Sequence, residues 1–441
     1  MKNKKIVLNL LYAAISSFMG LAHAGAQDNA TGFIEGSSLT LLNRLVYEQL
    51  EHQKGSSFKA VNGQRGRTQA KESGYGAMLN YQSGYTRGAV GFGVDAHAYG
   101  GINLDTQADS SRARYVASDG TDIANSFGRA GAALKVRLSS TELKVGEFRT
   151  KNPIFHSSDS RLLPETNRGW QITSNDLPSL SLQVGRFTDW ADRNAHKNGN
   201  DLLANYSGKN GDSFSFAGGT WQTPVNNLSM TSYLGQYEDN WNTWYVGGFY
   251  KLPLSQKRSL AFNLNIYRST DTGAAKSGEF STTTWSLMST YAFGAHKLGL
   301  GYQKVNGSNP FDSVNRGSIW LDNSMQLSDF NGPKEASWQF KYDVDLSNWV
   351  LPGLSAGVAY IRGSGIDYRH MNTVYVNYLG YAGHGGKHWE RDMLVRYVVQ
   401  SGATKGMNLQ MRYGVHRANK AQGEKNINQL RLQAEMPITI F

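Results

Sequence analysis

The sequence contains no cysteine, only nine prolines, and no apolar stretch long enough for a membrane-spanning helix. Without cysteine the chain can form neither a disulfide framework nor a zinc–thiolate site, and it has no thiol nucleophile. A transmembrane helix needs about 18 consecutive apolar residues, so the composition excludes a helical membrane protein. Two common enzyme signatures, H-E-x-x-H and G-x-S-x-G, are also missing, and the histidines are scattered. We therefore predict no cofactor, no metal site and no catalytic residue.

The N-terminus is typical of a secretory signal peptide. Three lysines among the first five residues precede an apolar run from Ile6 to Leu21, and small residues with an A-x-A motif follow. An uncleaved anchor is the alternative, but the run is short for a span of about 20 residues. We expect residues 1–24 to be a signal peptide, with cleavage after Ala24 or Ala26, and residues 27–441 to form a single domain.

The mature chain is basic. Removal of Lys2, Lys4 and Lys5 lowers the formal charge from +11 to +8. Basic proteins often bind nucleic acid or acidic surfaces. Because a secreted chain meets little nucleic acid, we expect its partners to be anionic solutes and no nucleic acid to be bound.

From Gly32 onward the chain reads as segments of about ten residues with alternating apolar and polar side chains. In one predicted hairpin, Thr243 to Leu252 and Ser259 to Arg268 flank a turn at Pro253 to Lys257. The second strand has an apolar face for lipid, made of Leu260, Phe262, Leu264 and Ile266. Its other face, for water, carries the amides of Asn263 and Asn265.

Two further hairpins follow the same pattern, one around a turn at 294–296 and one around a turn at Pro352-Gly353. Long polar connections separate them, from Asn306 to Ala336 and from Arg362 to Lys387. Short turns at one end and long loops at the other are typical of bacterial outer-membrane barrels. The length of the chain allows roughly sixteen to eighteen strands, which leaves an open channel. A soluble β-sandwich is the alternative fold.

Three strings of residues resemble the OprD family, the outer-membrane carboxylate channels. They lie near the start, the middle and the end of the chain, and they read GFIEGSSLTLLNR at 32–44, DSRLLPETNRGWQITSNDLP at 159–178, and WERD at 389–392 with YVVQSG at 397–402. Gly36 departs from the family pattern, in which an acidic residue is often found. The resemblance spans essentially the whole mature chain.

The resemblance implies an all-β fold, a transmembrane antiparallel β-barrel of 18 strands with an inward-folded third loop. It implies an outer-membrane porin of a Gram-negative bacterium, through which small nutrients diffuse passively. The expected solutes carry carboxylates, as amino acids, organic or aromatic acids and some antibiotics do. Expected partners are outer-membrane lipid and lipopolysaccharide, and the barrel-assembly machinery, which would read the terminal Phe441. The chain is expected to be a monomer or a weak trimer.

The segment from Thr150 to Pro178 interrupts the strand pattern and carries Asp159, Arg161 and Arg168. In the family this segment folds into the barrel and narrows it. A guanidinium offers a planar pair of donors that matches a carboxylate, so arginine suits a carboxylate filter better than lysine. An ordinary extracellular loop is the alternative.

Further arginines recur on predicted lumen faces and resemble the basic ladder of the family. They alternate with apolar neighbours near the C-terminus, and the set consists of Arg396, Arg412 and Arg431, with Arg44 in the first strand. Each could equally belong to an interior ion-pair network. Aspartates in the connection 306–336 could form an opposite acidic wall for a substrate ammonium group, and these are Asp312, Asp322 and Asp329.

Two other function classes stay open. An outer-membrane barrel hydrolase of the peptidase type could use a Ser–His pair that the sequence spacing does not reveal. A barrel adhesin or a passive structural protein would need no constriction, and it would leave the string at 159–169 unexplained.

Overall fold

Antiparallel strands make up nearly all of the regular structure. The computed structural model describes residues 25–53, 68–105, 115–117, 123–196 and 199–441. The predicted signal peptide therefore lies outside the described residues. Within the described part there are twenty strands, of which β8 (Asn200–Leu203) and β9 (Asn210–Gly211) are short additions to a wall of eighteen.

The first seven wall strands are β1 (Ser38–His52), β2 (Gln69–Gln82), β3 (Val90–Asn103), β4 (Ser126–Leu138), β5 (Thr141–Phe148), β6 (Thr166–Leu177) and β7 (Leu180–Ala191). The next six are β10 (Phe214–Gln222), β11 (Leu228–Tyr237), β12 (Trp241–Ser255), β13 (Arg258–Asp271), β14 (Ser281–Phe293) and β15 (His296–Asn306). The last five are β16 (Ala336–Asp345), β17 (Leu354–Asp367), β18 (His384–Val398), β19 (Asn408–Ala418) and β20 (Ile427–Thr439).

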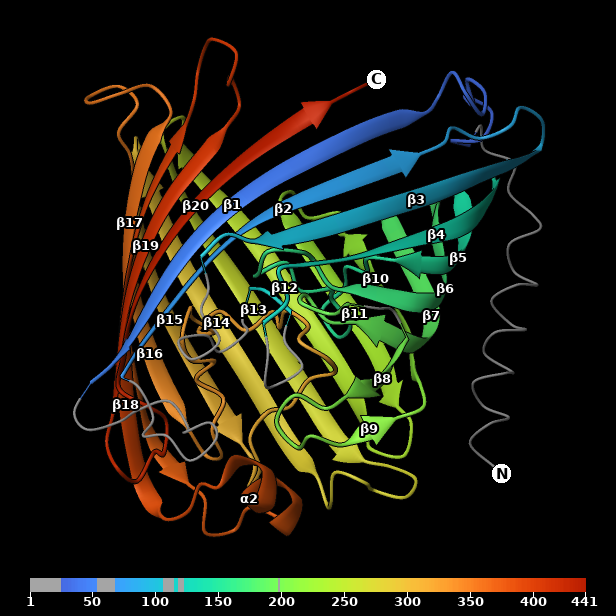
Figure 1. The fold of residues 1–441 in the computed structure, drawn as a ribbon. Coiled ribbons are helices and arrows are strands. Elements are labelled where there is room, and N and C mark those ends of the chain that lie inside the picture. The colour runs from blue at the N-terminus through green and yellow to red at the C-terminus, as the bar shows by residue number, and fades with distance from the viewer. Residues whose placement is uncertain (1–24, 54–67, 106–114, 118–122, 197–198) are drawn as a thin grey trace.

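The sheet closes on itself, as Figure 1 shows. β1 pairs with β2 on one side and with β20 on the other, and β10 pairs directly with β7, past the short β8 and β9. A closed sheet has no open edge, so every wall strand has a partner on both sides. The predicted antiparallel β-barrel of 18 strands is therefore confirmed.

The alternation along the strands separates an inner polar face from an outer apolar face. On β13, Asn263 and Asn265 donate hydrogen bonds to Asp322 of a segment inside the barrel, as their predicted lumen position requires. On β4 and β5, by contrast, Leu134 and Val145 are exposed to the outside. An apolar outer face is stable in hydrocarbon. None of the helices in the described part of the chain is long and apolar enough to span a membrane.

The two ends of the barrel differ in the length of their connections. Short turns follow β12, β14 and β16, and the C-terminus lies at the same end (Figure 1). The opposite end carries long connections, including 307–335 and 368–383, the latter with helix α2 (Thr373–Leu379). The predicted turn at 253–257 is shorter than expected, because β12 continues to Ser255 through a register shift at Pro253.

A second predicted boundary, that of the irregular region, is also wrong. The irregular region expected from Thr150 to Pro178 is limited to 149–165, because Thr166–Leu177 forms β6. The register of β6 shifts between Arg168 and Gly169, and this irregularity obscures the alternation in the sequence. Arg168 consequently lies on a wall strand.

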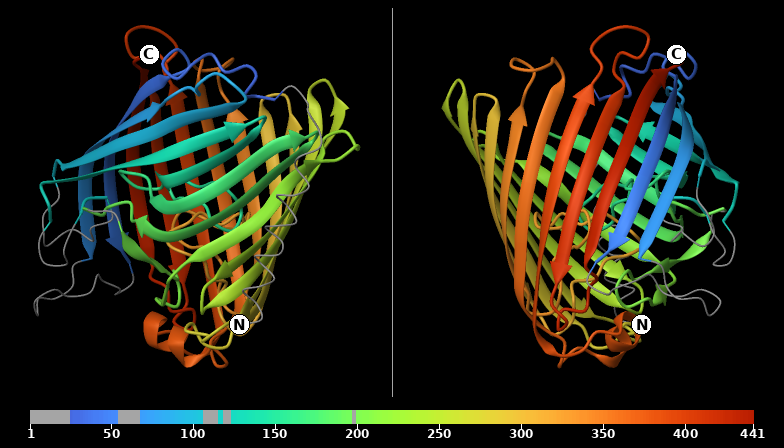
Figure 2. Two further views of the ribbon diagram at one scale, coloured as in Figure 1. Left: turned by 90° about the vertical axis from the view of Figure 1, so that its right-hand side faces the viewer. Right: turned by 60° about the vertical axis from the view of Figure 1, so that its left-hand side comes forward.

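Three connecting segments fold into the interior, and we call them the 115–117 segment, the constriction segment (149–165) and the 307–335 segment. Both views in Figure 2 show irregular chain between the walls. Apolar packing anchors these segments: Phe155 and Phe311 join the aromatic side chains of β10 to β13, and Leu162 and Leu163 pack with Tyr115 against β1 to β4. Burial of large apolar side chains holds the segments in place.

Candidate functional site

The constriction segment crosses the lumen. At one side Arg44 of β1 donates a hydrogen bond to the carbonyl of Arg161 at 2.7 Å, and at the other side Tyr267 of β13 donates to the carbonyl of Pro153 at 2.8 Å. β1 and β13 lie on opposite sides of the closed sheet. The segment therefore spans the barrel and narrows it.

Close packing fixes the height of this segment against β2. A Cβ atom on Gly76 would lie 3.0 Å from the carbonyl oxygen of Leu162, which is tighter than ordinary van der Waals contact. Only glycine leaves room for the backbone to approach this closely. Within the segment, burial raises the pKa of the Glu165 carboxyl group to about 8, and nearby Asp192 adds to this effect. Glu165 therefore takes up its proton at a higher pH than an ordinary glutamate does.

Three arginines form what we call the basic wall, on three neighbouring strands: Arg44 on β1, Arg431 on β20 and Arg412 on β19. Arg431 and Arg412 are direct register partners, so both point into the lumen at one height. Arg44 is buried and forms ion pairs with Asp159 at 2.8 Å and Glu435 at 2.7 Å.

Arg431 is also buried, and it forms an ion pair with Glu48 of β1 at 3.1 Å. Arg412 is half-buried, and its guanidinium donates to the Gln410 side chain at 3.0 Å and 3.3 Å. Within the described residues no carboxylate lies within ion-pair distance of Arg412. It is thus the uncompensated cation of the basic wall.

Tyr115, which the sequence analysis did not single out, orients the guanidinium groups beside it. Its ring centre lies 5.5 Å from the guanidinium carbons of both Arg161 and Arg431, at cation–π distance. Its hydroxyl group donates to Glu48 at 3.2 Å, and its backbone N–H donates to Glu72 at 3.0 Å. Nothing in the sequence around Tyr115 indicates that this short piece of a loop enters the lumen.

The two other arginines of the predicted ladder lie apart from this wall. Arg168 on β6 is half-exposed, 3.8 Å from the buried Glu147. Arg396 is near the short-turn end of β18, where it donates to the Asn408 side chain at 2.8 Å, and it forms no ion pair with a carboxylate among the described residues. The structure thus brings together Arg44, Arg161, Arg412 and Arg431 with Asp159, and it places Arg168 on β6 and Arg396 on β18 outside this group.

The predicted acidic wall is only partly present. Asp312 is buried and accepts hydrogen bonds from the backbone of Tyr206, Ser207 and Ser313 and from the Tyr375 hydroxyl group. Burial raises its pKa to about 6. Asp312 therefore anchors the 307–335 segment and presents no carboxylate to the lumen, and Asp329 is hydrogen-bonded to Tyr206 and Ser324.

Asp322 does reach the lumen. It accepts hydrogen bonds from Asn263 at 2.7 Å, Asn265 at 3.0 Å and Ser286 at 2.8 Å. It borders a cavity that is open to solvent. The wall strands contribute uncharged polar side chains to this cavity, which we call the amide wall: Thr220, Thr231, Asn263 and Asn265.

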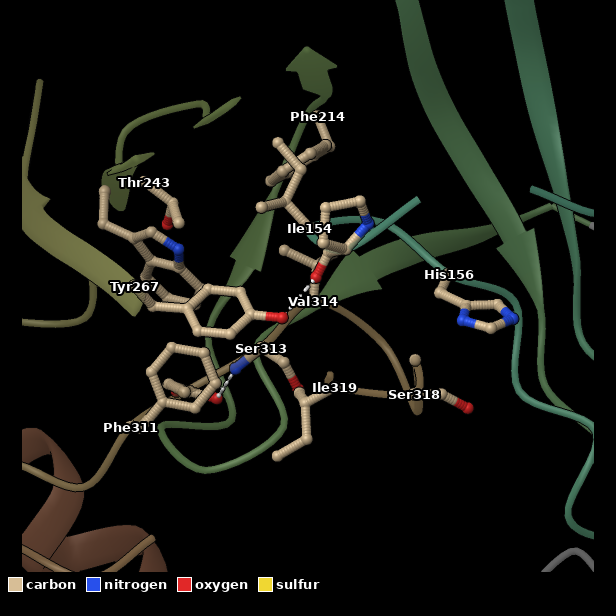
Figure 3. Close-up of a pocket in the computed structure, with 14 residues that line it drawn as sticks. Ile154, His156, Phe214, Thr243, Tyr267, Phe311, Ser313, Val314, Ser318 and Ile319 are labelled. Carbon is tan, nitrogen blue, oxygen red and sulfur yellow. Dashed lines mark hydrogen bonds between the residues drawn. The ribbon is translucent and has the colours of Figure 1, made fainter. Parts of the chain in front are cut away.

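A narrow pocket lies where the constriction segment meets the 307–335 segment (Figure 3). In this view the Tyr267 hydroxyl group reaches between the two segments, and His156 points away from it. His156 accepts a hydrogen bond from the Trp320 indole at 3.1 Å, and Ser160 bonds to Ser158 and Arg193. Neither residue forms a Ser–His pair in the part of the chain that the structure describes.

The geometry is that of a barrel with a polar lumen, narrowed by a charged segment, and the comparisons with known proteins agree with it. The family described as "outer membrane porin, OprD family" matches residues 31–440. Porin D of Pseudomonas aeruginosa is 40% identical over 432 residues, which cover 95% of each chain. The improved crystal structure of Pseudomonas aeruginosa OprD superposes with a TM-score of 0.81 at 38% identity, over 96% of this chain and 100% of that one. A crystal structure of Pseudomonas aeruginosa OpdK with vanillate gives a TM-score of 0.81 at 30% identity, over 92% and 100% of the two chains.

Proposed function

The chain belongs to the OprD family of outer membrane porins, and on this basis we propose that its channel selects small solutes that carry a carboxylate group. As a member of this family it is a diffusion channel of the outer membrane and has no enzymatic reaction to perform. The barrel hydrolase considered above is thereby set aside.

The observation that carries the proposal is Arg412, a half-exposed guanidinium without a carboxylate partner among the described residues, at the narrowed part of the lumen. A carboxylate that enters a narrow pore loses part of its hydration. Arg412 can replace those hydrogen bonds, and its planar donor pair matches the two carboxylate oxygens. Arg161 and Arg168 would extend this role along the constriction, and Arg396 toward the short-turn end.

Most cations of the basic wall are already compensated, and this compensation favours transport over tight binding. Arg44 has two carboxylate partners and Arg431 has one. Conduction requires binding that is strong enough to attract a solute but weak enough to release it. A single uncompensated arginine beside two compensated ones provides such an intermediate attraction.

Suitable solutes are amino acids, organic acids, aromatic acids and carboxylate-bearing antibiotics. Vanillate, with which OpdK was crystallised, is an aromatic acid and fits this class. The amide wall can accept the uncharged part of such a solute through hydroxyl and amide hydrogen bonds. Because the sheet closes within one chain, a single chain encloses a complete channel.

The test compares uptake within two pairs of solutes of similar size by liposomes that contain the purified protein. We expect benzoate to enter faster than benzyl alcohol once the basal permeation of empty liposomes is subtracted, and glutamate to enter faster than a neutral sugar of similar size. Equal rates within both pairs would contradict carboxylate selectivity and leave a general diffusion porin.

A further inference from the structure

Two histidines and a glutamate converge at the long-loop end of the barrel, away from the constriction. His388 lies at the start of β18, His416 near the end of β19, and Glu424 in the connection to β20. His388 Nδ1 is 3.0 Å from His416 Nε2 and 3.3 Å from Glu424 Oε2, and the last two atoms are 3.0 Å apart. Across the described residues, this is the one group of histidine and carboxylate atoms with the spacing of metal ligands.

The outer nitrogens of both imidazole rings have acceptors of their own. His416 Nδ1 lies 2.9 Å from the carbonyl oxygen of Lys425, and His388 Nε2 lies 2.5 Å from Glu335 Oε1. Because a carbonyl and a carboxylate oxygen accept hydrogen bonds, both outer nitrogens carry the proton. In neutral rings the inner nitrogens then present lone pairs to each other and to Glu424. Three facing lone pairs repel one another unless a positive charge lies between them, and either a proton on one inner nitrogen or a metal ion supplies it.

The spacing fits a zinc-sized ion. Zinc binds nitrogen and oxygen ligands at about 2.0–2.1 Å with tetrahedral geometry, which separates neighbouring ligand atoms by about 3.3 Å. The measured separations of 3.0–3.3 Å are close to this value. Two imidazoles and one carboxylate suit zinc and its neighbours among the transition metals better than calcium or magnesium, which prefer oxygen ligands.

The surroundings also resemble those of a metal site. Metal-bound histidines commonly donate their second N–H group to a carboxylate or a backbone carbonyl, as His388 and His416 do here. The two imidazoles and Glu335 are almost fully buried, whereas the Glu424 side chain is 27% exposed. An ion could therefore enter past Glu424.

From this arrangement we propose that His388, His416 and Glu424 bind one divalent transition-metal ion of the zinc class. The sequence analysis predicts no metal site, because the three ligands lie on separate elements and form no short motif. The ion would connect β18, β19 and the 419–426 connection. Ser328 donates to Glu424 Oε1 at 3.0 Å, and the backbone N–H groups of Leu327 and Ser328 donate to Glu390 of β18. The ion thereby secures the 307–335 segment inside the channel.

The test uses the full mature protein, purified in detergent without a histidine tag and freed of metal with EDTA. Calorimetric titration with zinc chloride should give one ion per chain, and cobalt chloride should produce the visible absorption of four-coordinate cobalt. His416→Gln and Glu424→Gln should abolish both signals. Glu335→Gln keeps the three ligands and should weaken binding by about 10- to 100-fold.

His296→Gln is the matched control, because His296 lies at the short-turn end, where it contacts Tyr342. This variant should bind zinc like the wild type. Altered migration of unboiled samples on a detergent gel establishes that each variant is folded. Absence of zinc and cobalt binding to folded wild-type protein would overturn the proposal and leave a shared proton as the occupant. Undiminished binding by folded Glu424→Gln and His416→Gln would equally overturn it.

Discussion

The basic wall and the amide wall face each other across the channel and differ in chemistry. The basic wall lies on β19, β20 and β1 and carries Arg412, Arg431 and Arg44. The amide wall lies on β10, β11 and β13 and offers hydroxyl and amide groups, with Asp322 as its single carboxylate among the described lining residues. The constriction segment passes between them.

This difference separates two tasks of a selective channel. Charged groups determine which ion enters, because their field acts over several ångströms in a narrow pore. Uncharged donors and acceptors replace lost hydration without a strong preference for one sign of charge. A solute with one carboxylate and an apolar body can thus contact both walls at once. Each prediction below alters one wall or the segment between them.

The largest effect should follow removal of the constriction segment. Replacing residues 152–163 with a short glycine–serine linker removes the chain that crosses the lumen, including the Pro153 and Leu162 contacts. The space between the two walls would then be filled by solvent. We expect single-channel conductance in a planar bilayer to rise several-fold, with loss of carboxylate preference.

The control shortens the turn at 400–405, which is exposed at the short-turn end. It should leave conductance near the wild-type value. If the folded deletion variant conducted like the wild type, the constriction segment would not limit the pore, and the two walls would not act together on a solute.

The next effect concerns the basic wall alone. Replacing Arg412 with alanine removes its uncompensated guanidinium, and we expect carboxylate uptake to fall about tenfold, the equivalent of ~1.4 kcal/mol. Uptake of a neutral sugar should change little. Replacement with lysine should restore anion selectivity but only part of the carboxylate preference, because the planar donor pair is lost. Arg161→Ala should act in the same direction.

Gln410→Ala provides the matched control, since Gln410 lies two residues away on the same strand face and accepts the Arg412 hydrogen bonds. It keeps the charge and should lower carboxylate uptake much less. Equal slowing of the neutral and the anionic solute in Arg412→Ala would mean that Arg412 acts through pore width, and the assignment of this wall to carboxylates would fail.

Much of the barrel could be predicted because alternation is a local property of each strand. The predicted faces of β13 and the predicted limits of the connection after Asn306 agree with the structure. The limits of the turn after β12 and of β6 were harder to predict. Register shifts at Pro253 and Arg168 break the two-residue period on which the prediction relies.

The interior contacts could be predicted only in part. The alternation of side chains along the strands placed Arg412 and Arg431 in the lumen. It could not show which of them has a carboxylate partner, since Glu48, the partner of Arg431, is nearly four hundred residues away in the sequence. Asp312 and Asp322 are both aspartates of the 307–335 segment. Asp312 is nevertheless buried and accepts four hydrogen bonds, whereas Asp322 reaches the lumen. Pairing and burial of this kind depend on packing between distant parts of the chain, which a local sequence pattern does not contain.

The convergence of His388, His416 and Glu424 shows the same limit. His388 and His416 lie on neighbouring strands, and parity would place each toward the lumen. Their distance from Glu424, however, depends on how the 419–426 connection folds back over the strand ends. Counting histidines on lumen faces of paired strands is the signal that could have indicated this cluster.

The smallest effect should come from the carboxylate of the amide wall. Burial raises the pKa of Asp322, although hydrogen bonds from Asn263, Ser286 and Asn265 oppose this shift. As the pH falls, Asp322 should therefore take up its proton before carboxyl groups with ordinary pKa values do. Loss of its negative charge leaves the arginines opposite as the dominant charges, so the channel should become more anion-selective.

Asp322→Asn makes the same change at neutral pH and keeps a side chain of similar shape. We expect a modest shift toward anions in the reversal potential at pH 7, with less change between pH 7 and pH 5 than in the wild type. Asp329→Asn is the control, because Asp329 lies in the same segment but is hydrogen-bonded to Tyr206 and Ser324 outside the cavity lining. If Asp329→Asn shifted selectivity as much as Asp322→Asn, the effect would come from the fold of the 307–335 segment. An unchanged reversal potential in Asp322→Asn would mean that the basic wall determines selectivity without help from the wall it faces.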